Sequence, residues 1–239
     1  MIILNVLILS SIAHCFMLPS TISTVSNYDG RIASFSNWAF GSEALEAQRI
    51  RSLFDGYLQD SGFNRDGIIL DVGCGPGRDL VGFLDVGYDV IGLEPSQLFC
   101  DAATDILSSK YPLDRYRVIK GDICDAEVAH KCLSAGKSIM GAFCLASLFH
   151  IPYSKLSVAL ININSVLAPG GLILSTFPIR NNVDGALLEG LRMPDGRWAT
   201  GFSVQQHAEL LKSHNFSVLH SSECSIYNGK WSSKLHYCT

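Results

Sequence analysis

The sequence predicts an α/β fold in which a mostly parallel sheet is covered by helices on both faces. Short apolar runs alternate along the chain with segments whose apolar residues recur at the helical period. Such alternation is typical of strand–helix–strand units with right-handed crossovers, which place their strands in parallel. Near the C-terminus, the runs 217–226 and 230–237 flank Asn228 and Gly229, and they predict a hairpin that adds an antiparallel strand.

Each expected element rests on its own pattern. Largely apolar runs are typical of buried parallel strands, and they cover residues 68–71, 89–93, 138–145 and 172–177; residues 116–120 (YRVIK) are a further candidate strand. Helical spacing of apolar residues covers 43–58, 79–86, 96–109, 125–133 and 154–167. A last helix is expected to begin at Ser203, which forms a capping box with Gln206.

The turn after the first strand carries the strongest functional signal. Asp71 ends the apolar run, and Gly73, Cys74, Gly75 and Gly77 follow it. Glycines allow a sharp turn and the close approach of a ligand, which a Cβ atom would prevent. The free N–H groups at the start of the next helix then face that ligand. The stretch therefore predicts a small cofactor at the carboxyl end of the first strand.

Acidic residues end the next two strands. Glu94 follows the second strand, where its carboxylate can accept both hydroxyls of a ribose; alone, it could equally be a solvated acid. Asp122 follows the third strand, where it can accept from an exocyclic amine of a purine; alone, it could be a turn residue bonded to its own backbone. With Asp71, these acids predict a site for a ribose and a purine without a pyrophosphate.

These motifs resemble those of the class I S-adenosylmethionine-dependent methyltransferases, in the small-molecule branch. Residues 71–77 (DVGCGPG) resemble the first motif of the family, while Glu94 and Asp122 resemble its ribose and adenine acids. Residues 145–152 (LASLFHIP) resemble the fourth motif, and residues 167–171 (LAPGG) resemble the turn before the fifth strand. The resemblance implies a Rossmann-like, mostly parallel seven-stranded sheet, with S-adenosylmethionine as the cofactor.

The same resemblance implies further roles for residues near the motifs. Pro95, Ile123 and Leu145 are expected to contact the cofactor. The implied reaction is displacement at the sulfonium methyl group by an O, N or S atom of a small-molecule acceptor. Alignment and exclusion of water matter most for such a reaction. His150 is the candidate base for an acceptor that must lose a proton, unless it only bonds its own loop. Ser147 could orient the acceptor or cap the loop.

Two further segments are candidates for closing the site. Tyr28, Phe35 and Trp38 precede the first expected helix, in a region that often folds over the cofactor in this family; the alternative is ordinary packing. Residues 178–201 are expected to be a long loop that forms a wall of the acceptor site. The arginines in this loop, Arg197 among them, favour an acidic acceptor weakly, because solvated surface charge would explain them too.

Composition and missing motifs exclude other classes. A chain of 239 residues with 48% hydrophobic residues can bury one large core, and its net charge of −4 without a basic run disfavours nucleic acid as a direct partner. Neither His130 nor His150 belongs to a metal-ligand cluster, so no metal is expected. A nicotinamide-dependent oxidoreductase is disfavoured by the G-x-G-x-G loop and the lack of Tyr-x-x-x-Lys. A non-catalytic cofactor-binding partner subunit stays open, as does the oligomeric state.

The N-terminus predicts a leader ahead of the methyltransferase domain at residues 28–239. Residues 1–15 are signal-like, and residues 16–27 resemble a linker or transit segment. The apolar run is too short for a stable membrane span. We expect targeting through the secretory route to a plastid or lumen; the alternative is a cytoplasmic enzyme whose start codon lies further along.

Overall fold

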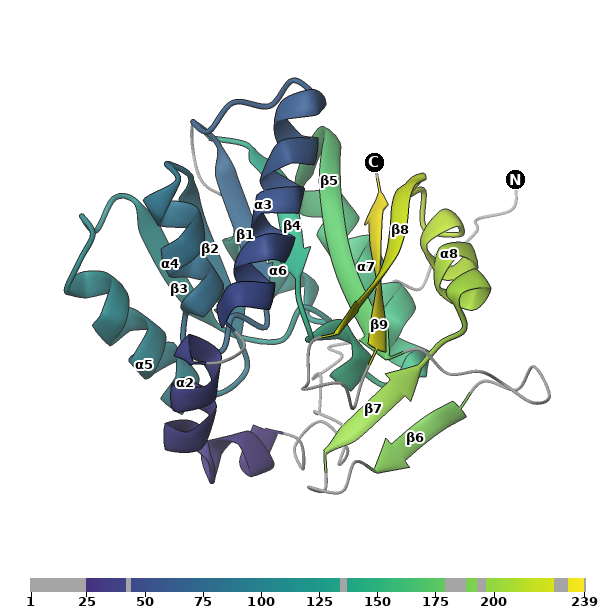
Figure 1. Ribbon diagram of the computed structural model, residues 1–239, viewed down its shortest axis with the longest axis horizontal. Helices are drawn as coiled ribbons and strands as arrows, with labels where there is room; N and C mark the ends of the chain where they lie inside the picture. Colours follow the sequence, from purple (N-terminus) through teal and green to yellow (C-terminus); the bar gives the residue numbers. More distant parts are fainter. Residues whose placement is uncertain are drawn as a thin grey trace, which may run out of the picture.

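The computed structural model describes residues 25–41, 44–133, 137–178, 188–192, 197–225 and 232–238. A central sheet in the order β3-β2-β1-β4-β5-β9-β8 lies between two layers of helices (Figure 1). Its strands are β1 (Ile68–Val72), β2 (Asp89–Glu94), β3 (Tyr116–Lys120), β4 (Ile139–Cys144), β5 (Leu167–Pro178), β8 (Val218–Ser225) and β9 (Ser232–Cys238). The predicted α/β class with a Rossmann-like parallel sheet is confirmed.

The strands β1 to β5 pair in parallel, and β9 pairs antiparallel with both β5 and β8. β1 lies between β2 and β4, and all five of its residues are buried. This burial on both faces explains the continuous apolar run that the sequence shows there. The carboxyl ends of β1, β2, β3 and β4 therefore meet at one edge of the sheet, which is the lower edge in Figure 1.

Helices cover the sheet on both faces. They are α2 (Ile32–Phe40), α3 (Ala44–Asp60), α4 (Arg78–Asp85), α5 (Gln97–Ser108), α6 (Ala126–Lys131), α7 (Tyr153–Val166) and α8 (Val204–Lys212), with a 3₁₀ turn η1 (Leu148–His150). Helices α3, α4 and α5 lie on one face, and α6 and α7 lie on the other (Figure 1). Because successive residues of a strand point to opposite faces, Leu70 packs in the core under α7 and Ile69 packs in the core under α3.

Three segments differ from the expected elements. The expected loop 178–201 contains β6 (Leu188–Arg192) and β7 (Trp198–Gly201), which form a separate antiparallel ribbon. The loop prediction was wrong there because neither run alternates clearly, and each depends on the other for pairing. β5 begins at Leu167, directly after α7, whereas the strand was expected from residue 172. Helix α7 ends at Val166, one residue before the expected end.

The N-terminal part of the described chain is helical. Residues 25–29 form a helical turn, α2 follows it, and both lie at the carboxyl edge of the sheet (Figure 1). The predicted leader 1–15 and most of the segment 16–27 lie outside the described residues. Among the described helices, none is both long and apolar enough to cross a membrane.

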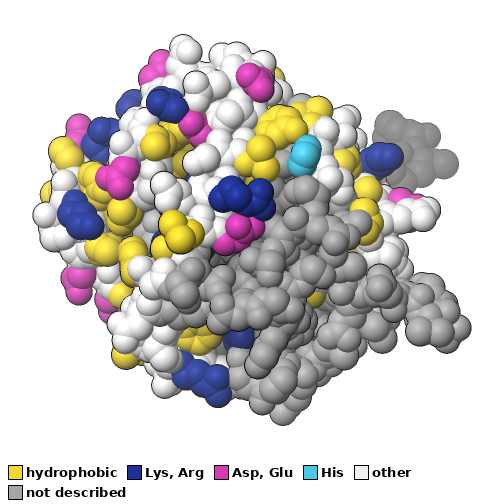
Figure 2. Space-filling view, viewed as in Figure 1, with side chains coloured by type: hydrophobic (Ala, Val, Ile, Leu, Met, Phe, Trp, Pro, Cys, Tyr) yellow, Lys and Arg dark blue, Asp and Glu magenta, His cyan; other side chains and the backbone are white. Residues whose placement is uncertain are grey.

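The described surface carries both signs of charge. On the face shown in Figure 2, Lys and Arg side chains are interspersed with Asp and Glu side chains, with small hydrophobic groups between them. Clustered basic side chains are what a phosphate backbone requires. The described part of this face therefore offers no continuous basic surface to a nucleic acid.

Candidate cofactor and acceptor site

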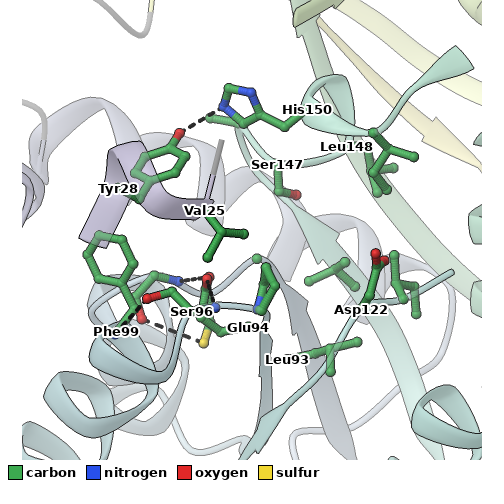
Figure 3. A pocket seen from close by; sticks show the side chains of 18 of the residues that line it. Val25, Tyr28, Leu93, Glu94, Ser96, Phe99, Asp122, Ser147, Leu148 and His150 are labelled. Atoms are coloured by element: carbon green, nitrogen blue, oxygen red, sulfur yellow. Dashed lines mark hydrogen bonds between the residues drawn. The ribbon is translucent and has the colours of Figure 1, made fainter. Parts of the chain in front are cut away.

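A cavity opens at the carboxyl edge of the parallel strands, where the loops after β1, β2, β3 and β4 converge. The N-terminal helical segment lies against it, and Figure 3 shows Glu94 and Ser96 on one side, Asp122 on the other, and Tyr28 with His150 above. The predicted site residues that line the cavity are Gly73, Cys74, Gly75, Glu94, Pro95, Asp122, Ile123, Leu145, Ser147 and His150. Most of the residues that sequence analysis predicted for the site therefore lie together at this cavity.

The glycine loop has the backbone that the sequence predicts. Gly73 and Gly75 have φ angles of +77° and +52°, in the left-handed region that glycine adopts without strain. A Cβ atom on Gly73 would lie 2.5 Å from the Cβ of Ser147, so the loop after β4 could not approach as it does. A Cβ on Gly75 would meet nothing within 4 Å and would project into open space. The loop therefore leaves room beside Gly75 for a ligand.

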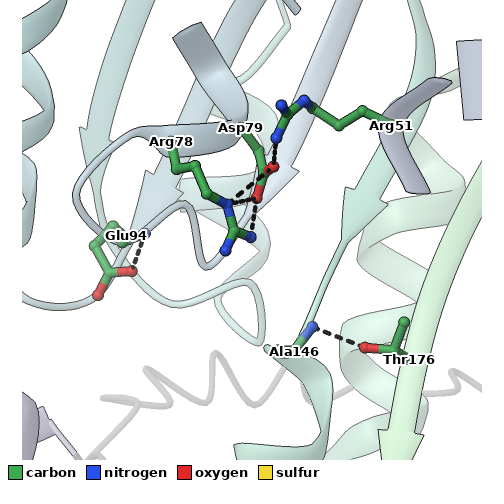
Figure 4. Close-up of polar contacts among 7 residues, drawn as sticks. Arg51, Arg78, Asp79, Glu94, Ala146 and Thr176 are labelled. Atoms are coloured by element: carbon green, nitrogen blue, oxygen red, sulfur yellow. Dashed lines mark hydrogen bonds and ion pairs between the residues drawn. The ribbon is translucent and has the colours of Figure 1, made fainter. Parts of the chain in front are cut away.

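Glu94 joins the end of β2 to the glycine loop. Its Oε2 accepts a hydrogen bond of 3.0 Å from the Gly75 N–H, drawn in Figure 4, and its Oε1 accepts one of 2.9 Å from the Ser96 N–H. The side chain is buried. Burial, together with the negative charge of Asp29, raises the pKa of Glu94 to about 7, although the two backbone hydrogen bonds lower it. Each carboxylate oxygen retains a lone pair for a ligand hydroxyl.

Asp122 combines the two roles that the sequence left open. Its Oδ1 accepts a hydrogen bond of 2.9 Å from the Cys124 N–H, which is the turn interaction expected of an aspartate after a strand. The half-buried side chain also lines the cavity, opposite Glu94 in Figure 3. A carboxylate has lone pairs to spare after one such bond, so Asp122 can still accept from an amine.

Asp71 and Gly77 are not among the residues that line the cavity, and their predicted contact with the cofactor stays a prediction. Asp71 is buried below the loop, and its Oδ2 has no hydrogen-bond partner within the described structure. Burial and the nearby charge of Asp79 raise the pKa of Asp71 well above its usual value. Gly77 has φ +90°, and a Cβ there would lie 3.2 Å from Ala103 of α5. Gly77 thus allows the loop to approach α5 closely.

Ion pairs hold the start of α4 behind the glycine loop. The Arg78 Nη2 lies 2.6 Å from Asp79 Oδ2, and Arg51 of α3 pairs with the other oxygen of the same carboxylate (Figure 4). Asp79 lies in the first turn of α4, where a negative charge is favourable. Since Arg78 is engaged with Asp79, its charge is partly neutralised at the cavity wall.

Cys74 lines the cavity with a thiol that stays protonated. The side chain is buried, and burial together with the charges of Asp71 and Glu94 raises the pKa of this thiol well above its usual value. The thiolate is the reactive form of cysteine. Cys74 therefore behaves as a small apolar side chain in the wall.

The loop after β4 brings Ser147 and His150 to the other side of the cavity. Ala146 has φ +56°, and its N–H donates a 2.8 Å hydrogen bond to the buried Thr176 Oγ1, as drawn in Figure 4. This turn aims Ser147 inward (Figure 3), and its buried Oγ has no hydrogen-bond partner in the described structure. Ser147 does not cap η1. Of its two predicted roles, contact with a ligand is the one that this placement favours.

His150 meets two residues that are distant in the sequence. Its Nε2 lies 2.8 Å from the hydroxyl oxygen of Tyr28, drawn as a dashed line in Figure 3. The Arg197 Nη1 donates a 2.5 Å hydrogen bond to the same hydroxyl. The Arg197 side chain is buried, with Cζ 4.9 Å from the Tyr28 ring centroid. Sequence analysis named Tyr28, His150 and Arg197 for separate reasons, and no sequence pattern predicted their contact.

The N-terminal segment is attached to the cavity wall by aromatic and polar contacts. The ring centroids of Tyr28 and Phe99 lie 5.8 Å apart, and Phe35 packs edge-on against Phe99. Ser96, which caps α5, also donates a hydrogen bond to Asp29. Sequence reasoning missed Asp29, Ser96 and Phe99, since no local pattern distinguishes them. The predicted role of Trp38 falls on a side chain outside the described part.

Within the described residues, no group of three or more His, Cys, Asp or Glu side chains is placed to bind a metal ion. The polar side chains that line the cavity come instead from several separate loops. Such an arrangement suits an organic ligand with several separate polar groups.

Residues 69–171 match a protein-family model described as a methyltransferase domain. No curated protein sequence matches the chain significantly. Among solved structures, the 1,6-didemethyltoxoflavin-N1-methyltransferase of Burkholderia thailandensis, with its substrate and S-adenosylhomocysteine bound, has a TM-score of 0.69 and 18% identity, and the match covers 93% of this chain and 90% of that one.

Two other solved structures share the fold. The magnesium protoporphyrin IX methyltransferase of Synechocystis PCC 6803, solved with S-adenosylmethionine, has a TM-score of 0.66 and 15% identity over 92% of this chain and 97% of that one. The [4+2]-cyclase SpnF has a TM-score of 0.63 and 18% identity over 80% of each chain. At such identities these likenesses show the fold alone.

Proposed function

We propose that this chain is a class I, S-adenosylmethionine-dependent methyltransferase that methylates an O, N or S atom of a small-molecule acceptor. The observation that carries the proposal is the position of Glu94. Its buried carboxylate stands at the carboxyl end of β2, bonded to Gly75 N–H, beside the open space that a Cβ on Gly75 would enter. That arrangement suits a ribose on the carboxylate and a ligand tail along the loop.

The cavity residues fit S-adenosylmethionine group by group. Glu94 would accept the ribose hydroxyls, and Asp122 would accept from the adenine amine. Pro95, Ile123 and Leu145 line the cavity and would supply its apolar contacts. When bound, the cofactor supplies an electrophilic methyl group on a positively charged sulfur. No pyrophosphate needs to be neutralised, which agrees with the engagement of Arg78 by Asp79.

The residues on the opposite side of the cavity would manage the acceptor. Tyr28 and Phe35 line the cavity and pack against Phe99 on the Glu94 side; together these rings would exclude water, which favours alignment of the reacting groups. The Ser147 hydroxyl is free to orient the acceptor. His150 would take up the proton of an acceptor that is not already ionised. The two neighbouring methyltransferases act on toxoflavin-type and porphyrin molecules, which supports a small organic acceptor here.

Calorimetry and a transfer assay test this proposal in two steps. We expect S-adenosylhomocysteine to bind and NAD not to bind; the reverse would select an oxidoreductase. The purified protein is then offered methyl-labelled S-adenosylmethionine with a panel of phenols, carboxylic acids, amines and thiols. Transfer to a panel member supports the proposal. Binding without transfer to any of them would favour the non-catalytic partner subunit, and the [4+2]-cyclase SpnF shows that this fold also serves another reaction.

We further propose that residues 1–15 direct the chain into the secretory route and are removed. The support is the nearly uninterrupted apolar run at residues 2–12. N-terminal sequencing of the native protein tests this, because an intact Met1 would contradict removal of a leader.

A further inference from the structure

Three segments that are far apart in the sequence meet at the Tyr28 hydroxyl. Tyr28 comes from the N-terminal helical turn, His150 ends η1 after β4, and Arg197 precedes β7. The Tyr28 oxygen lies 2.8 Å from His150 Nε2 and 2.5 Å from Arg197 Nη1. Tyr28 and His150 line the cavity, whereas Arg197, which is 6% exposed, is not among the lining residues.

The direction of one of these two hydrogen bonds is fixed by chemistry. A guanidinium has only donors and stays charged, so the Tyr28 oxygen must accept from Arg197. The hydrogen of the Tyr28 hydroxyl is then available to be donated. A neutral histidine has one donor nitrogen and one acceptor nitrogen, so Nε2 can accept that hydrogen only when the ring proton is on Nδ1.

We propose that Arg197 is a positioning residue that directs the Tyr28 hydroxyl hydrogen onto His150 Nε2. It thereby holds neutral His150 as the tautomer with its proton on Nδ1. The guanidinium also lies over the Tyr28 ring, with Cζ 4.9 Å from the centroid, and this contact holds the ring in place. Arg197, which directly precedes β7, thus links this segment to the reacting side of the cavity.

The inference deepens the proposed function by giving the acceptor's proton a route. The Tyr28 oxygen accepts from Arg197 and would also take up the proton of an acceptor bound in the cavity. As the acceptor X–H bond breaks, its electron pair stays on X and its proton passes to Tyr28. The original hydroxyl proton of Tyr28 passes to His150 Nε2, which becomes an imidazolium and later releases a proton to water. The Arg197 charge stabilises negative charge on Tyr28 during the transfer.

The tautomer of His150 can be measured without cofactor or acceptor. NMR of protein with ¹⁵N-labelled histidine rings distinguishes protonated from unprotonated ring nitrogens, and the His150 signals are assigned by their loss in His150→Gln. We expect the wild type to carry the His150 proton on Nδ1. In Arg197→Met both orientations of the Tyr28 hydroxyl are allowed, so signals of the Nε2–H tautomer should appear. Arg49→Met, which removes an exposed arginine of α3, should leave the His150 signals unchanged.

Two further variants separate positioning from packing. Tyr28→Phe keeps the ring under the guanidinium but removes the hydroxyl, so adding Arg197→Met to it should not change the His150 signals further. Arg197→Lys keeps a pure donor and should restore part of the Nδ1–H population. In turnover, Arg197→Met should lower kcat by about tenfold, within the contribution of one proton-transfer group, with the KM for the cofactor unchanged.

The inference is overturned if the wild type carries the His150 proton on Nε2, or if a folded Arg197→Met variant keeps the wild-type signals. Should Arg197→Met fail to fold, the wild-type spectrum and Tyr28→Phe still decide, because loss of the hydroxyl must also release the tautomer. Failure of the proposed function would be distinct. It would appear as absent S-adenosylhomocysteine binding or absent methyl transfer with the His150 tautomer as expected.

Discussion

The Oε2 of Glu94 accepts a 3.0 Å hydrogen bond from the backbone N–H of Gly75. This contact joins the ends of β1 and β2, the two neighbouring strands that form the floor of the cofactor site. It places a buried carboxylate beside the left-handed residue of the glycine loop. If the proposed function holds, we expect this pair to govern the affinity for an adenosine-containing ligand and the pH dependence of that affinity.

Glu94→Gln should weaken the binding of S-adenosylhomocysteine by about 10-fold to 100-fold, because hydrogen bonds to a charged partner contribute roughly 1.5–3 kcal/mol. The amide retains the size of the side chain but replaces one acceptor with a donor. Isothermal titration calorimetry measures the change. Glu127→Gln on the exposed surface of α6 is the matched control and should bind as the wild type does. Equal affinities of both variants would refute the role of Glu94.

Binding should also strengthen as the pH rises from 6 to 8. Burial raises the pKa of Glu94 from 4.5 to about 7, and the ionised carboxylate is the better acceptor for ribose hydroxyls. Below pH 7, binding should therefore release protons, which calorimetry in buffers of different ionisation enthalpy detects. A pH-independent affinity over this range would contradict the prediction.

The ligand-free protein should show the opposite trend in stability. A carboxyl group whose pKa is raised on folding stabilises the folded state fully below its unfolded pKa of about 4.5, and this contribution is lost as the pH rises through about 7. Denaturant unfolding at pH 5 and pH 8 measures the difference. Glu94→Gln should remove this part of the pH dependence, and an unchanged slope would show that other groups cause it.

Gly75→Ala should weaken both folding and ligand binding, whereas Gly62→Ala should weaken folding alone. Both glycines have positive φ, +52° and +84°, with open space around the position of a Cβ. An L residue in this region costs roughly 1–2 kcal/mol, so the two variants should lose similar stability. Only Gly75 lines the cavity, so only its methyl group should obstruct the ligand. Equal ligand affinities in the two variants would contradict the proposed course of the ligand.

His150→Ala should cut turnover at least tenfold while leaving cofactor affinity intact. The expected loss reflects removal of the group that takes up the acceptor's proton. His130→Ala, at an exposed position of α6, is the matched control and should turn over normally. Unchanged turnover in His150→Ala would leave His150 with a structural role in its loop. An acceptor that is already ionised would need no base, so the assay should use one that carries a proton.

Local sequence patterns alone predicted most of the strands and helices and the glycine loop of the candidate site. The alternation of apolar runs and helical periods identified the parallel strands and most helices, since burial on both faces imposes continuous apolar sequence on a strand. The glycine loop with Glu94 and Asp122 predicted the resemblance to methyltransferases and the proposed cofactor, because a turn that admits a ligand needs glycine and because acids at strand ends meet at one edge. Each of these signals is a pattern of a few neighbouring residues.

Other features depend on contacts between residues that are far apart in the sequence, and only the tertiary structure shows them. It placed Gly75 at the cavity, whereas Asp71 and Gly77 are not among the lining residues. It formed the ribbon of β6 and β7 from two runs that are weak alone, and it brought Arg197, Tyr28 and His150 to one hydroxyl. Contacts between such distant segments arise from packing of whole elements, and no local spacing in the sequence encodes them. The residues proposed to hold the cofactor can therefore be predicted from the sequence, whereas the contacts on the proposed acceptor side depend on the tertiary fold.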